Sequence, residues 1–324
     1  MAFNHFSFKV SAIAVAVISL LATTASAQTV GIGTTAPGSF THSSGSAMAK
    51  VIAEKTDLKA RIQPGSGTAH RRIAAGDVQF GLGNSWDTTF FVAGSQYYEG
   101  NGPKPNLRVA AVMTPLRVGI FVRKDSPIQS IEGLRGKNVP GGFTVQKNIK
   151  LLISAHLANA GMSYKDVRMN PAPNVVRAAD DFAKGKNDML FFAIGSAKIL
   201  QVSTKVGGIR ALSIDDSPAA VARMQKILPG SYPLTINPSK RYHGIVEPTK
   251  IIAFDFLLNT AAEVPEDVVY KVVKALHENK KGLLASFKGL DEFKPDHMVK
   301  KYTGLQYHPG AIKFYKEVGQ WPPK

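Results

Sequence analysis

A unit made of a short apolar strand, a loop of glycine and hydroxyl residues, and a helical segment recurs three times near the start of this chain. Its strands are predicted at residues 28–32, 58–62 and 78–82, and each runs into a polar loop. Because a helix that joins two strands returns the chain to the same end of the sheet, this repetition predicts an α/β fold with a parallel sheet. Ligands of such sheets bind at the carboxyl ends of the strands, so the three loops are candidates for a binding site.

The rest of the chain continues this alternation of strands and helices. Two apolar runs, 107–113 and 117–122, are separated by Thr114 and Pro115, which fits a strand that leaves one lobe and enters another. A glycine-containing loop then opens a long amphipathic helix predicted over 147–160, as the first loop does. Further strands are predicted at 164–169, 189–194, 209–214 and 251–258, helices at 43–55, 175–184, 197–205, 218–228, 266–280, 282–287, 296–302 and 310–318, and an irregular stretch at 229–248.

Residues 1–27 have the pattern of a cleavable signal peptide. Lys9 precedes an apolar run at 10–22, and the small residues Ala25, Ser26 and Ala27 suit a signal peptidase. An uncleaved membrane anchor is the alternative, but the run is shorter than the roughly 20 residues that span a bilayer. We expect cleavage after Ala27 and a soluble periplasmic protein. The sequence contains no cysteine, so an exported chain of this kind folds without disulfides.

The chain is strongly basic, because 40 Lys and Arg residues against 23 Asp and Glu residues give a formal net charge of +17. Such a charge often indicates nucleic-acid binding. Here the basic residues are scattered singly or in pairs, without the interleaved aromatic residues on which bases stack. Together with the predicted export, this argues against a nucleic-acid partner and favours a basic surface with a cleft that attracts anions.

The sequence lacks the motifs of common enzymes and cofactor sites. Gly31 and Gly33 are not followed by the third glycine of a dinucleotide-binding loop, and neither a Gly-Lys-Ser/Thr phosphate loop nor a nucleophile elbow occurs. The eight histidines do not have the spacing of metal ligands. We therefore expect no catalytic residue, no cofactor and no metal. An enzyme that uses none of these motifs is the least favoured alternative.

Several segments, taken in order, resemble motifs of one family of binding proteins. They are the strand, Gly/Thr-rich loop and helix at 30–55, the loop at 64–66, the segments 73–82 and 130–139, and a C-terminal signature at 264–279, 305–311 and 314–315. Their order and spacing make nearly the whole mature chain similar to the TAXI-type solute-binding proteins that serve TRAP transporters. The resemblance is weaker in two loops, where residues 36–40 replace the family's Tyr-Tyr-Pro and residues 84–86 replace its Gln-Ser-Asp.

This resemblance implies a two-lobed α/β fold like that of type II periplasmic binding proteins, with each lobe a sheet flanked by helices and a ligand cleft between them. Residues 28–116 would form the first lobe and 117–260 the second, and 261–324 would return to the first lobe as helices. The implied function is a monomeric receptor that closes on a small carboxylate-bearing solute, an organic acid or amino-acid-like ligand. It would deliver this solute to an ion-gradient-driven TRAP permease with fused large and small subunits. A receptor for an ATP-driven importer or a sensor kinase is the alternative.

Candidate ligand-binding residues come from five loops, three in the first lobe and two in the second, and from an arginine near the hinge. Hydroxyl groups and N–H groups at helix starts suit a carboxylate, an aromatic ring can cover it, and the arginine can pair with it. The alternative for each residue is an ordinary turn, core or solvated position. We expect Thr34→Ala and Phe40→Ala to weaken binding while folding stays nearly unchanged. The candidates are Thr34, Thr35, Ser39, Phe40, Ser66, Gly67, Thr68, Asn84, Trp86, Arg117, Phe143, Thr144, Val145, Gln146, Gly195 and Ser196.

Overall fold

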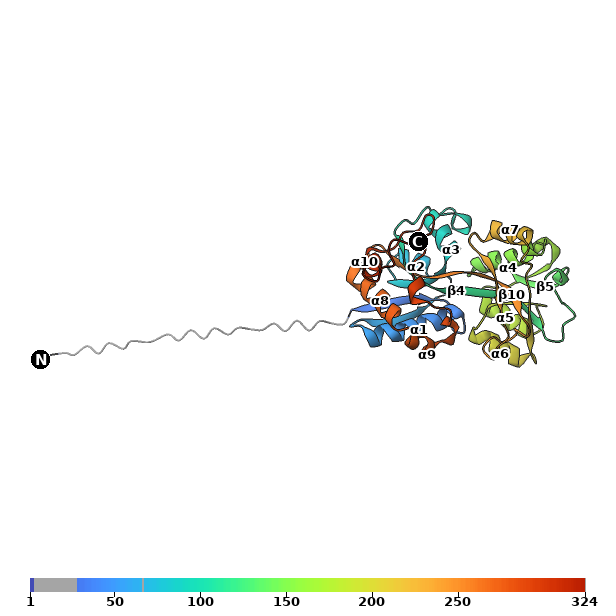
Figure 1. Ribbon diagram of the computed structural model, residues 1–324, viewed down its shortest axis with the longest axis horizontal. Helices are drawn as coiled ribbons and strands as arrows, with labels where there is room; N and C mark the ends of the chain where they lie inside the picture. Colours follow the sequence, from blue (N-terminus) through green and yellow to red (C-terminus); the bar gives the residue numbers. More distant parts are fainter. Residues whose placement is uncertain (3–27, 66, 324) are drawn as a thin grey trace.

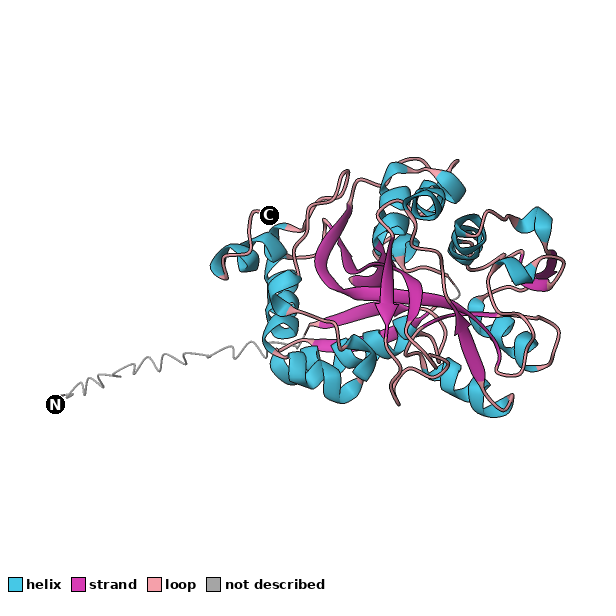
Figure 2. Ribbon diagram, turned by 45° about the vertical axis from the view of Figure 1, so that its right-hand side comes forward, coloured by secondary structure: helices cyan, strands magenta, loops and turns pink. Residues whose placement is uncertain are grey.

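The computed structural model describes residues 1–2, 28–65 and 67–323 (Figure 1). Residues 3–27, which hold the predicted apolar run and cleavage site, lie outside the described residues, as does Ser66. In the described part of the chain, no helix combines the length and the apolar content needed to cross a membrane. Two groups of elements, here called the first and the second lobe, lie side by side and are joined by two long strands (Figures 1 and 2).

The first lobe is built on a sheet in which the strands follow the order β2-β1-β3-β10-β4. Strands β1 (Thr29–Thr34), β2 (Lys59–Pro64) and β3 (Phe80–Asn84) are parallel, with β1 between the other two. This arrangement confirms the parallel sheet predicted from the N-terminal repeat. Strand β10 (Thr249–Ala261) is antiparallel to both β3 and β4 (Leu107–Arg123).

Helices cover both faces of this sheet. In Figure 1, α1 lies on one side, whereas α2 and α3 lie on the other. The C-terminal helices α8 and α9 pack against α1, and α10 packs against α8. The bounds are α1 Phe40–Lys55, α2 His70–Ala74, α3 Ser85–Ala93, α8 Glu266–Glu278, α9 Lys280–Ser286 and α10 Pro309–Glu317.

The second lobe is built on the other halves of β4 and β10. Strands β7 and β8 pair with the end of β4, β9 pairs with the start of β10, and β5 and β6 form a separate parallel pair. Helices α4 to α7 surround these strands (Figure 1, right). The bounds are β5 Asn138–Gly141, α4 Asn148–Asn159, β6 Arg168–Pro171, α5 Val175–Ala183, β7 Leu190–Ala193, α6 Ala197–Lys205, β8 Ile209–Leu212, α7 Pro218–Ile227 and β9 Tyr232–Ile236.

Strands β4 and β10 pass through both lobes and pair with each other from Val118 and Ile252 to Leu107 and Ala261. The sequence predicts two separate apolar runs here, whereas the structure has the single strand β4. Pro115 lies inside this strand, opposite a residue of β10, and β7 joins the other edge of β4 only from Val118 onward. An edge without a strand partner tolerates the missing N–H of a proline, which explains why β4 is continuous.

Some predicted elements have other bounds in the structure. Helix α1 begins at Phe40 rather than at residue 43, because Ser39 Oγ accepts a hydrogen bond from the N–H of His42 at 3.1 Å and caps the helix earlier. The stretch after β3, predicted as a loop, is the start of α3. The stretch 229–248 contains β9, because β10 offers it a pairing edge. Residues Tyr164–Asp166 form a 3₁₀ turn ahead of β6 instead of joining a strand.

The prediction of a helix at 296–302 is wrong. In this stretch only the end of a 3₁₀ turn, Pro295–His297, forms. The backbone of this segment bonds to other parts of the chain instead of to itself. Met298 accepts a hydrogen bond from the N–H of Val112 at 2.9 Å, and the N–H of Lys300 donates to the hydroxyl of Tyr307 at 2.9 Å. These tertiary hydrogen bonds override the local helix propensity.

Candidate functional site

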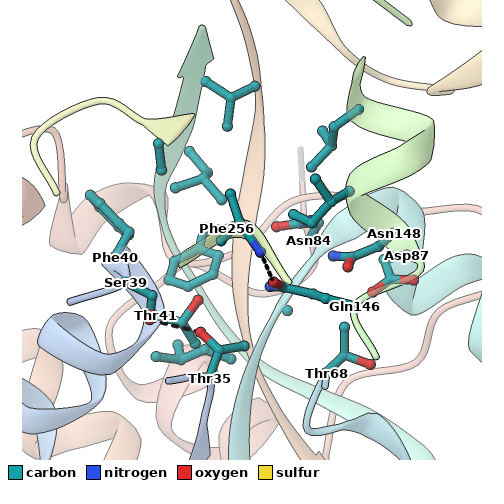
Figure 3. Close-up of a pocket in the computed structure, with 18 of the residues that line it drawn as sticks. Thr35, Ser39, Phe40, Thr41, Thr68, Asn84, Asp87, Gln146, Asn148 and Phe256 are labelled. Carbon is teal, nitrogen blue, oxygen red and sulfur yellow. Dashed lines mark hydrogen bonds between the residues drawn. The ribbon is translucent and has the colours of Figure 1, made fainter. Parts of the chain in front are cut away.

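A cavity lies between the two lobes, against the strands that cross from one to the other (Figure 3). Its volume, taken as the space open to the centre of a water-sized sphere, is ≈ 70 Å³. One water molecule needs roughly 10–15 Å³ by this measure, so the cavity suits a small solute. We call it the central cavity. Its lining residues are Thr35, Ser39, Phe40, Thr41, Thr68, Leu82, Gly83, Asn84 and Asp87 of the first lobe, Leu116, Val118 and Phe256 of β4 and β10, and Gln146, Asn148, Ile149, Leu152, Val175, Phe191, Phe192 and Ala193 of the second lobe.

Four helices begin at the central cavity. Phe40, Asn148 and Val175 are the first residues of α1, α4 and α5, and Asn84 immediately precedes α3. The first N–H groups of a helix have no partner inside the helix, and the helix dipole adds partial positive charge at this end. The four helix starts therefore create a positive environment from backbone groups, which suits an anionic group of a ligand.

Hydroxyl and amide side chains add hydrogen-bonding groups to both walls. Thr35 Oγ1 and Ser39 Oγ lie 2.7 Å apart at the start of α1, close enough for one hydroxyl to donate to the other. Across the cavity, Gln146 Oε1 accepts a hydrogen bond from the N–H of Val175 at 3.1 Å, which fixes this amide at the start of α5. Figure 3 shows both interactions, one on each side. Polar groups of both lobes can thus contact one ligand.

Aromatic and aliphatic side chains form the remaining wall. The rings of Phe40 and Phe256 pack edge to face with their centroids 5.7 Å apart, and the ring of Phe40 also packs against Phe287 at 5.1 Å. From the second lobe, α4 and β7 contribute Ile149 and Phe192 among others. Phe40 is therefore part of the core as well as of the cavity, so Phe40→Ala would remove core packing along with any ligand contact.

Asp87 is the sole ionisable side chain among the described residues that line the central cavity. Its carboxylate is fully buried, and Oδ1 accepts hydrogen bonds from the hydroxyls of Tyr97 and Tyr98, the latter at 3.1 Å. Burial raises the pKa of Asp87 to about 7 and outweighs the two tyrosine hydrogen bonds, which lower it. His70 Nδ1 lies 3.6 Å from Oδ2, but burial lowers the pKa of His70 to about 3. His70 is thus neutral near pH 7 and does not form an ion pair with Asp87.

A second cavity opens beside the first and shares Thr68, Gln146 and Asn148 with it. Its volume by the same measure is ≈ 580 Å³, and we call it the outer cavity. It differs from the central cavity in having basic side chains in its wall. Its other lining residues are Pro64, Gly65, Gly67, Arg71, Arg72, Tyr97, Tyr98, Thr144, Val145 and Lys147.

The candidate residues that the structure describes divide into three groups: those that line the central cavity, those that line only the outer cavity, and those that line neither. Ser66 falls outside the described residues. Thr35, Ser39, Phe40, Thr68, Asn84 and Gln146 line the central cavity, Gly67, Thr144 and Val145 line the outer cavity, and Thr34, Trp86, Arg117, Phe143, Gly195 and Ser196 line neither.

Buried packing accounts for three of the residues that line neither cavity. Thr34 is 1 % exposed, and its methyl group packs against Gly45 of α1, where an added Cβ would lie 2.4 Å away. Trp86, for which a core position was the alternative, is 2 % exposed and packs edge to face against Phe254. Phe143 is 1 % exposed. These side chains belong to the core, so substitutions there test folding before they test binding.

Arg117 already has a carboxylate partner within the protein. Its guanidinium donates to Asp291 Oδ1 at 2.8 Å and to the hydroxyl of Tyr242 at 3.0 Å. Asp291 also pairs with Arg241 through its other oxygen at 2.9 Å. The side chain of Arg117 is 4 % exposed, so a ligand carboxylate would have to displace Asp291 to reach it.

Gly195 and Ser196 lie where the second lobe meets the segment after α9. A Cβ added to Gly195 would lie 3.8 Å from Gly289 Cα, and Ser196 is a buried residue directly before α6. Sequence reasoning also missed lining residues that follow the predicted loops, namely Thr41, Asp87 and Asn148. Each lies in the first turn of a helix. A polar residue at such a position is a signal that could have identified them.

Comparison with known proteins places this site in context. The chain matches the NMT1-like family over residues 32–319. It resembles a solved structure described as a periplasmic transporter, with 14 % identity, a TM-score of 0.58 and coverage of 90 % of this chain and 93 % of that chain. It also resembles the ligand-binding component of an ABC-type import system from Staphylococcus aureus, with 10 % identity, a TM-score of 0.52 and coverage of 92 % and 94 %.

A further similar structure is the alkanesulfonate-binding protein SsuA from Xanthomonas axonopodis pv. citri bound to MOPS. It has 12 % identity, a TM-score of 0.50 and coverage of 91 % of this chain and 93 % of that chain. At these identities the likeness shows a shared fold. It confirms the predicted two-lobed α/β architecture of periplasmic solute-binding proteins.

Proposed function

Because the chain belongs to the NMT1-like family, we propose that it is a solute-binding receptor that acts outside the cytoplasm and catalyses no reaction. The proteins of similar fold described above, which bind ligands for import or bind an alkanesulfonate, support this class of function. The sequence pattern of residues 1–27 supports export through a signal peptide cleaved after Ala27. The receptor acts as a monomer in this proposal.

The proposed ligand is a small solute with a carboxylate group. The observation that carries this proposal is the convergence of four helix starts on a cavity whose described lining contains no Lys or Arg side chain. In such a site the N–H groups of α1 and the hydroxyls of Thr35 and Ser39 would bind the carboxylate oxygens. The apolar wall around Phe256 and Phe192 would hold the body of the ligand.

Closure of the two lobes would capture this ligand. Strands β4 and β10 cross between the lobes and are the natural hinge, while Ser39 and Gln146 offer polar groups from opposite walls. A ligand that contacts both walls stabilises the closed form by its affinity for that form. In the outer cavity, Arg71, Arg72 and Lys147 would raise the local concentration of anions at the entrance.

The receptor would deliver its ligand to a TRAP-type permease, as the similarity to TAXI proteins implies. Uptake by proteoliposomes that contain a candidate permease should then require the loaded receptor and an ion gradient, without ATP. Uptake that depends on ATP instead would favour an ATP-driven importer. This second candidate has support from the fold shared with the Staphylococcus aureus import component.

Calorimetry and thermal melting of the purified protein test the ligand class directly. The panel should contain dicarboxylates, oxo acids, amino acids and aromatic acids, and also sulfonates, because the Xanthomonas protein of similar fold holds MOPS. We expect at least one carboxylate to bind and to raise the melting temperature. The absence of any heat or melting shift with every carboxylate would contradict the proposal.

The variant Thr35→Val tests the carboxylate end of the site. It removes a hydroxyl from the cavity wall and keeps the shape of the side chain, so carboxylate binding should weaken by about tenfold while the fold is retained. Thr89→Val is the matched control, because the Thr89 hydroxyl bonds to the carbonyl of Ser85 within α3 and lines neither cavity. Equal affinities of the two variants would place the carboxylate elsewhere.

A further inference from the structure

One carboxylate oxygen in the central cavity lacks a hydrogen-bond partner. Among the described residues, no donor reaches Asp87 Oδ2, although the side chain is fully buried. His70 Nδ1 lies 3.6 Å from Oδ2, beyond hydrogen-bond distance. Oδ1 of the same carboxylate is already bonded to the hydroxyls of Tyr97 and Tyr98. A buried acceptor in this state is costly, unless a group from outside the chain satisfies it.

A second unpartnered oxygen comes from the second lobe. Asn148 Oδ1, at the start of α4, is buried and has no hydrogen-bond donor among the described residues. Figure 3 shows Asn148 and Asp87 on the same side of the central cavity, whereas Thr35 and Ser39 lie on the other side. Each lobe thus presents an acceptor at one end of the cavity, and the first lobe presents the hydroxyls of Thr35 and Ser39 with the start of α1 at the other end.

We propose that Asp87 is a specificity-determining residue that accepts hydrogen bonds from a primary ammonium group, and that the ligand is an α-amino acid with an apolar side chain. The proposal rests on the function proposed above, in which the helix starts and hydroxyls bind the ligand carboxylate. An ammonium group carries three donors and one positive charge, so it can satisfy Asp87 Oδ2, neutralise the carboxylate and reach Asn148 Oδ1. The apolar wall then takes the side chain.

Charge favours this assignment over a plain organic acid. Asp87 has neither Lys nor Arg beside it among the described lining residues of the central cavity, so its negative charge is left for the ligand to balance. A dicarboxylate would place a second negative group close to Asp87. The raised pKa of Asp87 agrees with this arrangement, because the free site lacks a cation to stabilise the charged form.

Matched pairs of probes that differ in a single group give the sharpest test. L-leucine is compared with 4-methyl-2-oxopentanoate, and L-phenylalanine with phenylpyruvate, by calorimetry at pH 7.5. In each pair the oxo acid keeps the carboxylate and the side chain but replaces the ammonium group by a carbonyl. We expect the protein to bind the amino acid of at least one pair tighter by about tenfold or more, because a site built for a donor rejects the analogue that lacks it.

The variant Asp87→Asn should reduce or reverse this preference. It weakens amino-acid binding by about tenfold or more and leaves oxo-acid binding equal or tighter. Thr88→Val is the control, because the Thr88 hydroxyl bonds to the carbonyl of Asn84, to His70 and to Asn259 without lining either cavity. It should lower stability and keep the preference for the amino acid. An unchanged preference in Asp87→Asn would overturn the assignment of Asp87.

A measurement on the unaltered protein keeps the proposal testable if Asp87→Asn does not fold. The titratable groups that face Asp87 are His70 of α2 and the hydroxyls of Tyr97 and Tyr98. Amino-acid affinity should rise from pH 5.5 to pH 8, because the ammonium group binds the ionised carboxylate.

Affinity that falls over this range, or tighter binding of the oxo acids, would overturn the inference and leave the proposed carboxylate receptor standing. If none of the four probes binds but other carboxylates do, the inference is likewise overturned and the proposed carboxylate receptor stands.

If no carboxylate binds, both the inference and the proposed carboxylate receptor are overturned.

Discussion

At the level of single residues, Asp87 and His70 have opposite effects on how stability depends on pH. The folded pKa of Asp87 is raised to about 7, so the unfolded chain ionises first and stability falls as pH rises from about 4 to 7. The folded pKa of His70 is lowered to about 3, so stability rises with pH from about 3 to 6.5. Between about pH 4 and 6.5 the two contributions cancel.

Asp87→Asn should expose the contribution of His70. Without ligand, the free energy of unfolding of this variant should rise relative to the unaltered protein by about 1.4 kcal/mol per pH unit between pH 4 and 6.5. Urea denaturation at three pH values in this range measures the difference. Parallel pH profiles for the two proteins would show that Asp87 is already ionised in the folded state.

Single residues also show how far the sequence could lead. The sequence could indicate Thr35 and Ser39 as lining residues of a cavity, because hydroxyls in a glycine-rich loop after a strand have a local signature. Trp86 and Arg117 line neither cavity, which the sequence could not indicate, because their surroundings depend on distant residues, Phe254 for the ring and Asp291 for the guanidinium. The position of Asp87 in the first turn of a helix could have indicated it as a lining residue, but its burial and its unpartnered oxygen are visible only in three dimensions.

At the level of elements, the segment after α9 is joined to the crossing strand β4 by an ion pair between the buried Arg117 and the partly buried Asp291. Burial alone would raise the pKa of Asp291, but hydrogen bonds from Tyr242 and the charge of Arg117 hold it below its ordinary value. Asp291→Asn should destabilise the protein by about 3 kcal/mol at pH 7, because it leaves the buried Arg117 unpaired. The loss should shrink as pH falls through the pKa of Asp291, where the carboxylate of the unaltered protein is itself protonated.

A matched control separates this pair from ordinary surface charges. Lys250 and Asp216 lie 2.7 Å apart but are 43 % and 48 % exposed, so Asp216→Asn should change the free energy of unfolding by about 1 kcal/mol or less. Urea denaturation of both variants gives the comparison. If the two losses are equal, the contact between β4 and the segment after α9 does not contribute as a buried pair.

Elements themselves were predicted well where the pattern is local. The parallel strands β1 to β3 and helices such as α4 and α6 follow from apolar spacing and turn residues. The continuity of β4 through Pro115 and the missing helix at 296–302 could not be predicted. Both depend on pairing with distant segments, β10 in the first case and Val112 and Tyr307 in the second.

At the level of the whole molecule, the proposed capture of a ligand requires the lobes to separate and close again. Gly38 of the first lobe faces Lys198 of α6 in the second, and a Cβ added to Gly38 would lie 4.0 Å from Lys198 Cβ. This separation falls in the range of about 3.5–4.5 Å that a disulfide needs. The sequence has no cysteine, so a pair introduced here has no other partner.

The double variant Gly38→Cys and Lys198→Cys should therefore lock the cleft when oxidised. Cysteine at position 38 must adopt φ +86°, which costs roughly 1–2 kcal/mol and is tolerable in a loop. We expect the oxidised protein to exchange a bound ligand far more slowly than the reduced protein, and a reductant to restore the rate. Each single variant serves as a control for the strain at that position. Rapid exchange by the oxidised double variant would mean that the ligand enters without separation of these two segments, and the hinge assigned to β4 and β10 would lose its role in capture.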